Sequence, residues 1–391
     1  MFLNDKPELK EQLYRCSKCG YCRDTISDEL DFYHVCPVYD VLRMEHFCGR
    51  GRATIALGLR EEVIQFSEPL ANLVYTDLGC GACREICPEN IDIPAITRAL
   101  RKEIVDRGLE SPKLKQIFLA LKDKHNIFGE EKPRSNWAYD LDLPNNGKTL
   151  YFAGCSASYT YPETARAIIN ILSEAGLKVA YLGEDEWCCG APALWSGYME
   201  FFENITRFNL SAIKASKAKT VIFGCAVCYN TFKTHYQSII GKLPFKTLHI
   251  SEVIYDLMVK GRIHLQSVRK KFTYHDPCHL GRDEKVYEPP REIIKKIPNS
   301  EFYEMPRNRR SAFCCGEGVI VSTLFPNLTR KISANRISEA KEIGANAIVT
   351  CCPGCVTTLS KAAAWLKSKE KVEIGVYDLP IVVAEAMRLK L

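Results

Sequence analysis

A pattern of five cysteines occurs twice in the second part of this 391-residue chain. In each copy a single cysteine is followed by an adjacent pair with a glycine directly after it, and then by a C-x2-C unit. The two sets are Cys155, Cys188, Cys189, Cys225 and Cys228, and Cys278, Cys314, Cys315, Cys352 and Cys355. Equivalent cysteines lie 123 to 127 positions apart, which indicates a duplicated unit. Five thiols are one more than a tetrahedral zinc site or a cubane iron–sulfur cluster needs.

Short apolar strands alternate with helices through both copies. The first copy predicts strands at 149–154, 178–182 and 220–224 and helices at 162–175, 199–217 and 252–260. The second predicts strands at 271–275, 301–305 and 346–350 and helices near Arg291 and over 322–342 and 379–389. This alternation predicts two α/β units with mostly parallel sheets. Several cysteines follow strands directly, so we expect each set of five to converge at the carboxyl edge of its sheet.

The region before the repeat contains eight further cysteines. Three of them form C-x2-C-x2-C, three form C-x2-C-x3-C followed by proline, and two stand alone: Cys16, Cys19 and Cys22; Cys80, Cys83 and Cys87; Cys36 and Cys48. Paired C-x2-C units also occur in zinc ribbons, which is the alternative. The triple spacing and the two Cys-Pro pairs favour iron–sulfur binding.

These patterns divide the chain into four segments. We expect a small helical cluster-binding domain at 1–125, a linker rich in glycine, proline and asparagine at 126–147, and two α/β domains at 148–262 and 263–391. The predicted fold class is therefore α+β and multidomain.

Composition limits the compartment and the partners. The first fifteen residues are polar and charged, and no apolar run reaches the roughly 18 residues of a membrane span. An odd count of nineteen cysteines favours metal binding over a disulfide framework. The net charge of +6 is spread without a dense basic block, which disfavours nucleic-acid binding. We expect a cytoplasmic protein with no direct membrane span, peripheral on the inner face of a membrane only through a partner.

The N-terminal cysteines resemble those of a bacterial ferredoxin with two four-iron clusters. The resemblance implies one cubane cluster on Cys16, Cys19, Cys22 and Cys87, and a second on Cys36, Cys80 and Cys83. Thirteen residues separate Cys22 from Cys36, and Asp77 stands where a fourth cysteine is expected. Three alternatives remain open for that corner of the second cluster: Asp77, Cys48, or a [3Fe-4S] cluster without it.

The repeat resembles the CCG domain of heterodisulfide reductases and their relatives. The matching blocks are GCSASY at 154–159, WCCGAP at 187–192, HDPCHLGR at 275–282, FCCGEG at 313–318 and CCPGC at 351–355. In that family a complete motif implies a non-cubane [4Fe-4S] cluster on five cysteines. Two complete copies imply that all ten repeat cysteines are catalytic.

The combined resemblance is to the D-type subunit of heterodisulfide reductase, a ferredoxin-like C-type module fused to a B-type module. It implies an enzyme that passes electrons from two cubanes to two non-cubane clusters and cleaves a disulfide, such as CoM-S-S-CoB, to two thiols. The implied electron donor is a membrane cytochrome b or a soluble flavoprotein. The alternative is an electron-transfer subunit of a flavin-dependent glycolate, D-lactate or glycerol-3-phosphate dehydrogenase that feeds a quinone pool. Clusters that serve only as structure or as a wire are a third interpretation.

Other residues near the motifs receive roles by chemistry. The candidates for proton donation or for orienting a ligand are His275 and His279, with His235 and His249 as weaker ones. We interpret Asp276 as a turn cap, Trp195 as a core residue that could wall a substrate cleft, and Cys351 as a cysteine that does not bind metal.

Overall fold

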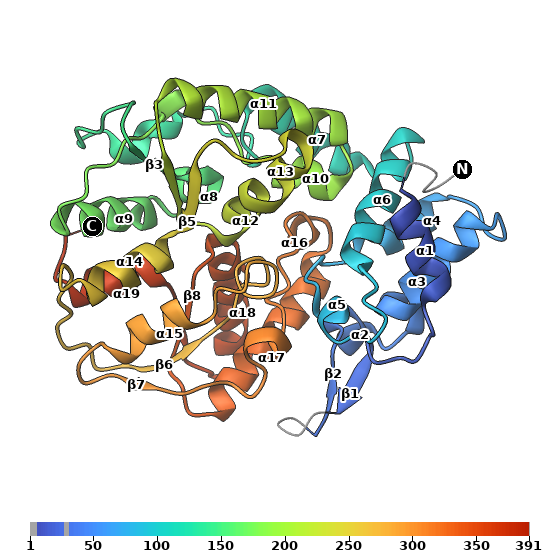
Figure 1. Cartoon of the computed structure of the whole chain (residues 1–391). Helices are drawn as coiled ribbons and strands as arrows, with labels where there is room; N and C mark the ends of the chain where they lie inside the picture. Colours follow the sequence, from blue (N-terminus) through green and yellow to red (C-terminus); the bar gives the residue numbers. More distant parts are fainter. Residues whose placement is uncertain (1–5, 27–30, 391) are drawn as a thin grey trace.

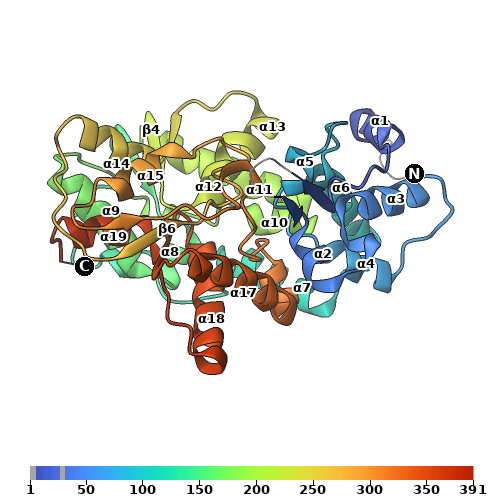
Figure 2. The same ribbon diagram turned by 90° about the horizontal axis from the view of Figure 1, so that it is seen from below.

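The computed structural model describes residues 6–26 and 31–390, so the first residues of the polar N-terminal stretch lie outside the described part. A helical module lies on one side of the molecule and two α/β units lie one above the other on the opposite side (Figure 1). The view from below shows the same separation of the module from the two units (Figure 2). The predicted order of a helical module and two α/β units with parallel sheets is confirmed.

The N-terminal module is built from short helices and one hairpin. Its elements are α1 (Pro7–Arg15), β1 (Asp24–Ile26), β2 (Phe32–His34), α2 (Pro37–Leu42), η1 (Glu45–Phe47), α3 (Gly49–Arg60), α4 (Glu68–Tyr75), α5 (Ala82–Glu85), α6 (Ile93–Asp106) and α7 (Pro112–Lys124). Proline opens several of these helices, where its missing N–H costs no hydrogen bond. The antiparallel β1–β2 hairpin fills the long insertion between Cys22 and Cys36.

The first α/β unit has a three-stranded parallel sheet in the order β3-β4-β5. Its elements are η2 (Arg134–Ala138), β3 (Thr149–Phe152), α8 (Gly154–Tyr159), α9 (Pro162–Glu174), η3 (Gly183–Asp185), α10 (Ala191–Ser196), α11 (Met199–Ala215), β4 (Thr220–Phe223), α12 (Ala226–Asn230), the π-helical turn η4 (Thr231–Tyr236), α13 (Gln237–Ile240), β5 (Lys246–His249) and α14 (Ile250–Val259). The strand predicted at 178–182 is reduced to a single bridge between Ala180 and Leu150.

The second unit has a four-stranded parallel sheet in the order β7-β6-β8-β9. Its elements are β6 (Lys271–Tyr274), α15 (Glu288–Lys295), β7 (Glu301–Phe302), η5 (Arg309–Ser311), α16 (Val321–Leu324), α17 (Pro326–Glu342), β8 (Ala347–Thr350), α18 (Pro353–Glu370), β9 (Gly375–Asp378) and α19 (Leu379–Ala386). The single helix predicted over 322–342 is wrong, because Pro326 starts a new helix and separates α16 from α17.

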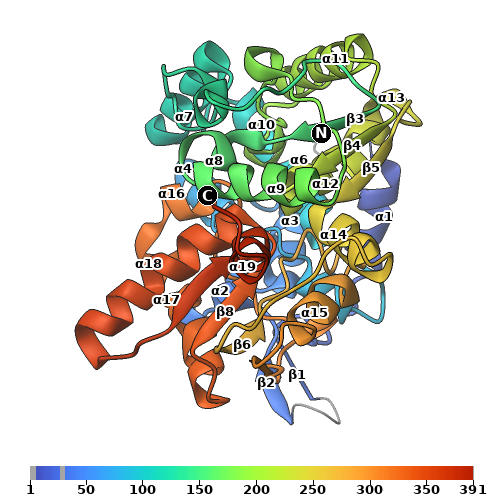
Figure 3. The same cartoon turned by 90° about the vertical axis from the view of Figure 1, so that its left-hand side faces the viewer.

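The last helix of each unit packs on the other unit. α14 of the first unit packs against α15 of the second, and α19 of the second packs against α9 of the first (Figure 3). The module contacts both units, through α6 on α10 and through α2 on α17. Residues 126–147, interpreted from the sequence as a linker, carry η2 and bury Arg134 and Trp137 against the first unit.

Candidate metal centres

Five N-terminal cysteines line one cavity, and one of them is Cys83, which is expected for the second cluster. The other four come from the loop after α1 and from the turn after α5, and they are the set expected for the first cluster: Cys16, Cys19, Cys22 and Cys87. The start of α3 closes this cavity, where the backbone N–H of Arg50 donates to the sulfur of Cys22 at 3.0 Å. Such N–H bonds stabilise a thiolate ligand.

A second cavity lies beside the first and shares Cys83 with it. Asp77 lines it together with the three cysteines expected for the second cluster, which are Cys36, Cys80 and Cys83. Cys48 is not among its lining residues, because its thiol contacts Cys22 and the backbone carbonyl of Glu45. The structure therefore brings Asp77 to the second set of cysteines and Cys48 to the first.

The Asp77 carboxylate is only 13% exposed and is held by three groups. It accepts hydrogen bonds from the backbone N–H of Gly79 at 2.8 Å and from the Thr97 hydroxyl at 2.7 Å, and Arg52 lies 3.5 Å away. Burial raises its pKa, but the charges of Arg52 and Arg101 outweigh burial and hold the pKa below the usual range. Asp77 is therefore a fixed anionic oxygen at the open corner of the three-cysteine set.

The ten cysteines of the repeat form one continuous series of side-chain contacts. Within each copy, neighbouring thiols interact electrostatically in the order Cys155, Cys188, Cys189, Cys228 and Cys225, and in the order Cys278, Cys314, Cys315, Cys355 and Cys352. The sulfurs of Cys315 and Cys355 are 3.2 Å apart. All nineteen cysteines are free thiols. Five sulfurs exceed the four ligands of zinc and of a cubane alike, so the donor set fits the non-cubane cluster on five cysteines that the sequence resemblance implies.

Two contacts join the three cysteine-bearing parts of the chain. The first copy meets the second where the thiol of Cys225 interacts with the thiol of Cys352. The second copy meets the N-terminal module where the thiol of Cys80 interacts with the thiol of Cys314. The second copy therefore lies between the module and the first copy in this series of sulfurs.

Backbone geometry explains the glycine after each cysteine pair. Gly190 and Gly316 both have positive φ, +85° and +88°. A Cβ at Gly190 would meet the Phe202 ring at 2.8 Å, and one at Gly316 would meet the Thr329 carbonyl at 2.9 Å. Only glycine adopts this conformation without strain, so the turn after each pair is fixed in both copies.

The two candidate histidines occupy different environments. His275 is buried and accepts a hydrogen bond on Nδ1 from Arg336 at 3.2 Å, which leaves Nε2 as the N–H that faces Cys315. His279 bonds through Nδ1 to Asp283 at 2.8 Å. Burial lowers the pKa of His279, but the Cys278 thiolate and Asp283 outweigh burial and raise it to about 10. The weaker candidates differ, because burial lowers the pKa of His235 and of His249 to about 3.

Buried charged residues that the sequence patterns did not single out surround the thiols. Arg134 lies 3.4 Å from the sulfur of Cys155 and pairs with buried Glu186 at 3.2 Å. Glu186 also accepts the backbone N–H groups of Ala153 and Gly154, both at 2.8 Å, which fixes the loop that carries Cys155. Neither Arg134 nor Glu186 belongs to a cysteine motif, and Arg134 lies in the segment that the sequence predicts to be a linker.

The second copy has its own set of such groups. Arg282, within the block HDPCHLGR, is buried beside Cys80, Cys278 and Cys314. Burial raises the pKa of Glu317, and the Cys315 and Cys352 thiolates raise it further, to about 7. Two sequence features could have pointed to these residues. Arg282 stands four residues after Cys278, and Glu317 directly follows a cysteine pair and its glycine.

Three further residues have environments that bear on their expected roles. Asp276 forms a bidentate ion pair with Arg291 at 2.7 and 2.8 Å and accepts the backbone N–H of Arg309 at 2.9 Å. Trp195 is buried 5.6 Å from His279, between ring centroids. Cys351 is buried against Tyr274.

Two domain families match the chain. The Cysteine-rich domain (CCG) matches residues 149–233 and 272–360, and the 4Fe-4S dicluster domain matches residues 12–91. The second match spans the Cys16 to Cys87 set and the first covers both copies of the five-cysteine pattern. The chain thus contains iron–sulfur domains of two kinds.

The chain is also similar to curated proteins over nearly its whole length. It is 30% identical to the D-type subunit of the dihydromethanophenazine:CoB–CoM heterodisulfide reductase of Methanosarcina mazei, over 97% of this chain and 95% of that protein. It is 31% identical to the corresponding protein of Methanosarcina barkeri, with the same coverage. The EtfAB:quinone oxidoreductase of Syntrophomonas wolfei is 25% identical over 95% of this chain and 58% of that protein.

The fold is shared with a solved structure. The crystal structure of a hypothetical protein from Helicobacter pylori aligns with a TM-score of 0.55 and 13% identity, over 78% of this chain and 59% of that one. Within residues 6–26 and 31–390, none of the helices combines the length and the apolar character that a bilayer span requires.

Proposed function

Because the chain belongs to the family of D-type heterodisulfide reductase subunits, we propose that it is the polypeptide in which a disulfide is split into two thiols. Family membership establishes the coarser statement, an iron–sulfur subunit of a heterodisulfide reductase-type or related oxidoreductase complex with several clusters. The finer proposal concerns the reaction, the ligand sets and the direction of electron flow, with electrons that enter through the N-terminal module from a partner subunit.

We assign four clusters to four sets of ligands. Cys16, Cys19, Cys22 and Cys87 hold the first cubane, and Cys36, Cys80 and Cys83 with Asp77 hold the second. Each five-cysteine copy holds one non-cubane cluster. When bound, such clusters supply single electrons and soft iron sites for sulfur. Cleavage of a disulfide takes up two electrons and two protons and releases two thiols.

The contact between Cys225 and Cys352 is the observation that carries this proposal. It joins the two copies end to end, so one small substrate can reach both sets of sulfurs. Cys225 and Cys278 are each partly exposed, whereas the other eight repeat cysteines are buried. We therefore place the disulfide beside Cys225, at the junction of the two copies.

Neighbouring side chains supply positioning and proton-holding groups. His275 Nε2–H orients the Cys315 sulfur, because Arg336 occupies the other ring nitrogen. Asp283 fixes Nδ1 of His279, so Nε2 is the atom of that ring on which a proton can be held or released beside Cys278. Trp195 is buried against the ring of His279.

Iron content and substrate response test the proposal. The full chain, purified without oxygen, is expected to contain about sixteen irons in four four-iron clusters. Addition of a disulfide to the oxidised protein is expected to give a new paramagnetic signal, and dithionite-reduced protein is expected to release two thiols per disulfide. A colourless zinc-containing preparation would refute the assignment of the clusters, and iron-loaded protein that leaves every disulfide intact would refute the reaction.

The similarity to the EtfAB:quinone oxidoreductase favours a second candidate function, electron transfer between a flavin-dependent dehydrogenase and a quinone pool. In that case the two five-cysteine sites act as relays without a substrate. The same preparation distinguishes the two, because a relay passes electrons to a quinone analogue at the same rate with or without the disulfide.

The Asp77 assignment has its own test. Asp77→Ala is expected to leave a three-iron cluster at the second cubane site and to lower the total by one iron per chain. Asp77→Cys is expected to keep four irons at that site. Cys48→Ser is the matched control and leaves the second cubane unchanged, because Cys48 contacts Cys22 instead. Loss of the second cubane in Cys48→Ser, with no change in Asp77→Ala, would reverse the assignment.

A further inference from the structure

Arg282 joins a ligand loop of the N-terminal module to a ligand loop of the second copy. Its side chain is only 1% exposed. Nε donates to the backbone carbonyl of Cys80 at 2.7 Å, and Nη1 donates to the carbonyl of Ala312 at 2.6 Å. Ala312 lies two residues before Cys314, so one guanidinium holds the Cys80 loop next to the chain segment that carries Cys314.

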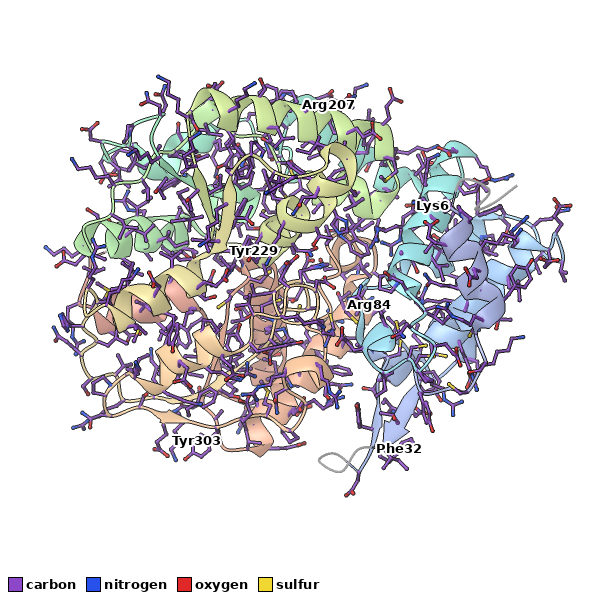
Figure 4. All side chains as sticks on the ribbon, viewed as in Figure 1. Lys6, Phe32, Arg84, Arg207, Tyr229 and Tyr303 are labelled. Atoms are coloured by element: carbon purple, nitrogen blue, oxygen red, sulfur yellow. The ribbon has the colours of Figure 1, made fainter. Side chains whose placement is uncertain are left out.

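The positive charge of Arg282 lies among sulfurs rather than carboxylates. Among the described residues, Arg282 forms no ion pair within 4 Å and its Nη2 has no hydrogen-bond partner. The neighbouring Asp283 is engaged by Arg84 at 2.6 Å and by His279 at 2.8 Å; Arg84 is labelled where the module meets the units (Figure 4). The thiolates of Cys80, Cys278 and Cys314 raise the pKa of Arg282 against the effect of burial, so its charge acts mainly on these thiolates.

The first copy has no such uncompensated charge. Four residues after its first cysteine stands Tyr159, where the second copy has Arg282. Arg134 approaches Cys155, but buried Glu186 pairs with it at 3.2 Å and neutralises much of its field. The two cysteine sets are therefore equivalent in spacing and unequal in the charge around them.

We propose that Arg282 is a positioning residue for electron entry, which holds the second N-terminal cluster against the second-copy cluster and raises the reduction potential of both. The proposal rests on the four clusters of the proposed function. The step is the passage of one electron between two clusters, in which no bond forms or breaks and no proton moves. A nearby positive charge favours the reduced, more negative state of a cluster, and the effect is strong in a buried site. Electrons from the partner subunit thus reach the second copy before the first.

Redox titration of the full anaerobic protein with dithionite, followed by electron paramagnetic resonance, tests this role. In Arg282→Gln the equilibrium constants for one-electron reduction of the second N-terminal cluster and of the second-copy cluster are expected to fall about tenfold, which is about 59 mV for each couple. Arg282→Lys keeps the charge and is expected to keep both potentials, while the loss of paired carbonyl contacts slows transfer between the clusters. Arg134→Gln is the matched control and is expected to shift only the first-copy cluster.

Unchanged potentials in Arg282→Gln, or equal shifts in the Gln and Lys variants, would overturn the proposal. Where the Gln variant does not retain iron, Arg282→Met replaces it as the uncharged variant with a stem of similar length. The titration needs no disulfide, so its result stands apart from the reaction. Potentials that shift as expected in a protein that cleaves no disulfide would refute the proposed function alone.

Discussion

The ion pair between Asp276 and Arg291 predicts an unusual asymmetry between two substitutions. Asp276, two residues before Cys278, is 2% exposed and receives two hydrogen bonds from Arg291 and one from the backbone of Arg309. Arg291 has a second partner, Glu304, at 2.8 and 2.9 Å. When Asp276 is removed, Arg291 keeps Glu304 as an ionic partner. When Arg291 is removed, Asp276 has no other ionic partner among the described residues, so its buried charge is more poorly compensated.

The structure gives approximate magnitudes for both changes. Breaking a buried ion pair by removal of one partner costs about 3 to 5 kcal/mol. Arg291→Met leaves the Asp276 carboxylate buried with one backbone N–H, so we expect a cost of about 5 kcal/mol. Asp276→Asn leaves Arg291 paired to Glu304, which is 28% exposed, so we expect about 3 kcal/mol. In the double variant no unpaired buried carboxylate remains, and we expect it to be about 2 kcal/mol more stable than the sum of the single changes implies.

Urea unfolding of the anaerobic, iron-loaded chain measures these differences, with cluster absorbance and circular dichroism as probes. Arg309→Gln is the control, because its side-chain pairs with Glu288 and Glu304 are partly exposed and its backbone N–H to Asp276 is retained. We expect it to cost less than about 1 kcal/mol. A larger cost for Asp276→Asn than for Arg291→Met, or strictly additive costs, would refute the reasoning.

Three further changes probe the packing around the sites. Gly79→Ala is expected to lower stability by about 2 to 4 kcal/mol in thermal unfolding, because φ is +62° and a Cβ would lie 2.3 Å from the Trp195 ring; an unchanged midpoint would contradict this. Cys351→Ala is expected to keep all iron and to cost about 1 to 2 kcal/mol in urea unfolding, so loss of iron would show that Cys351 binds a cluster. Lys285→Ala removes the exposed ion pair with Glu85 and is expected to cost less than about 1 kcal/mol, so a larger loss would show that module docking depends on this pair.

Much of the fold could be predicted because local patterns determine it. The alternation of apolar strands and helices is sufficient to predict two α/β units, and helix α9 follows directly from Pro162 at its start and Gly176 after its end. Strands β5 and β9 and helix α18 were not predicted. The two strands are short and partly exposed, so they have no distinct apolar run, and α18 begins at a proline inside a cysteine block that is typical of a loop.

The ligand candidates of the sites could be predicted from the sequence, because cysteine motifs mark them. The resemblance to a two-cluster ferredoxin implies ligand sets whose members line the two cavities, and the missing cysteine left Asp77, Cys48 and a three-iron cluster as alternatives. Long-range partners cannot be found in this way, because Arg282 reaches the Cys80 carbonyl across 202 positions and Arg134 reaches Cys155 from outside any motif. Contacts of this kind depend on how the units pack, which no local pattern specifies.

The last helix of each copy packs on the other copy, which joins the two duplicated units. Helix α19 is almost wholly buried, with Leu379, Val382 and Val383 fully buried, and it packs on α9 of the other unit. Separation of the two units would expose this face and the matching face of α14 to water, at about 1.5 to 3 kcal/mol for each large apolar side chain. The two copies are therefore repeats of sequence that fold as one body. Because the helices interlock, the contact between Cys225 and Cys352 cannot open without disrupting this apolar packing, which keeps both sets of sulfurs beside the same site.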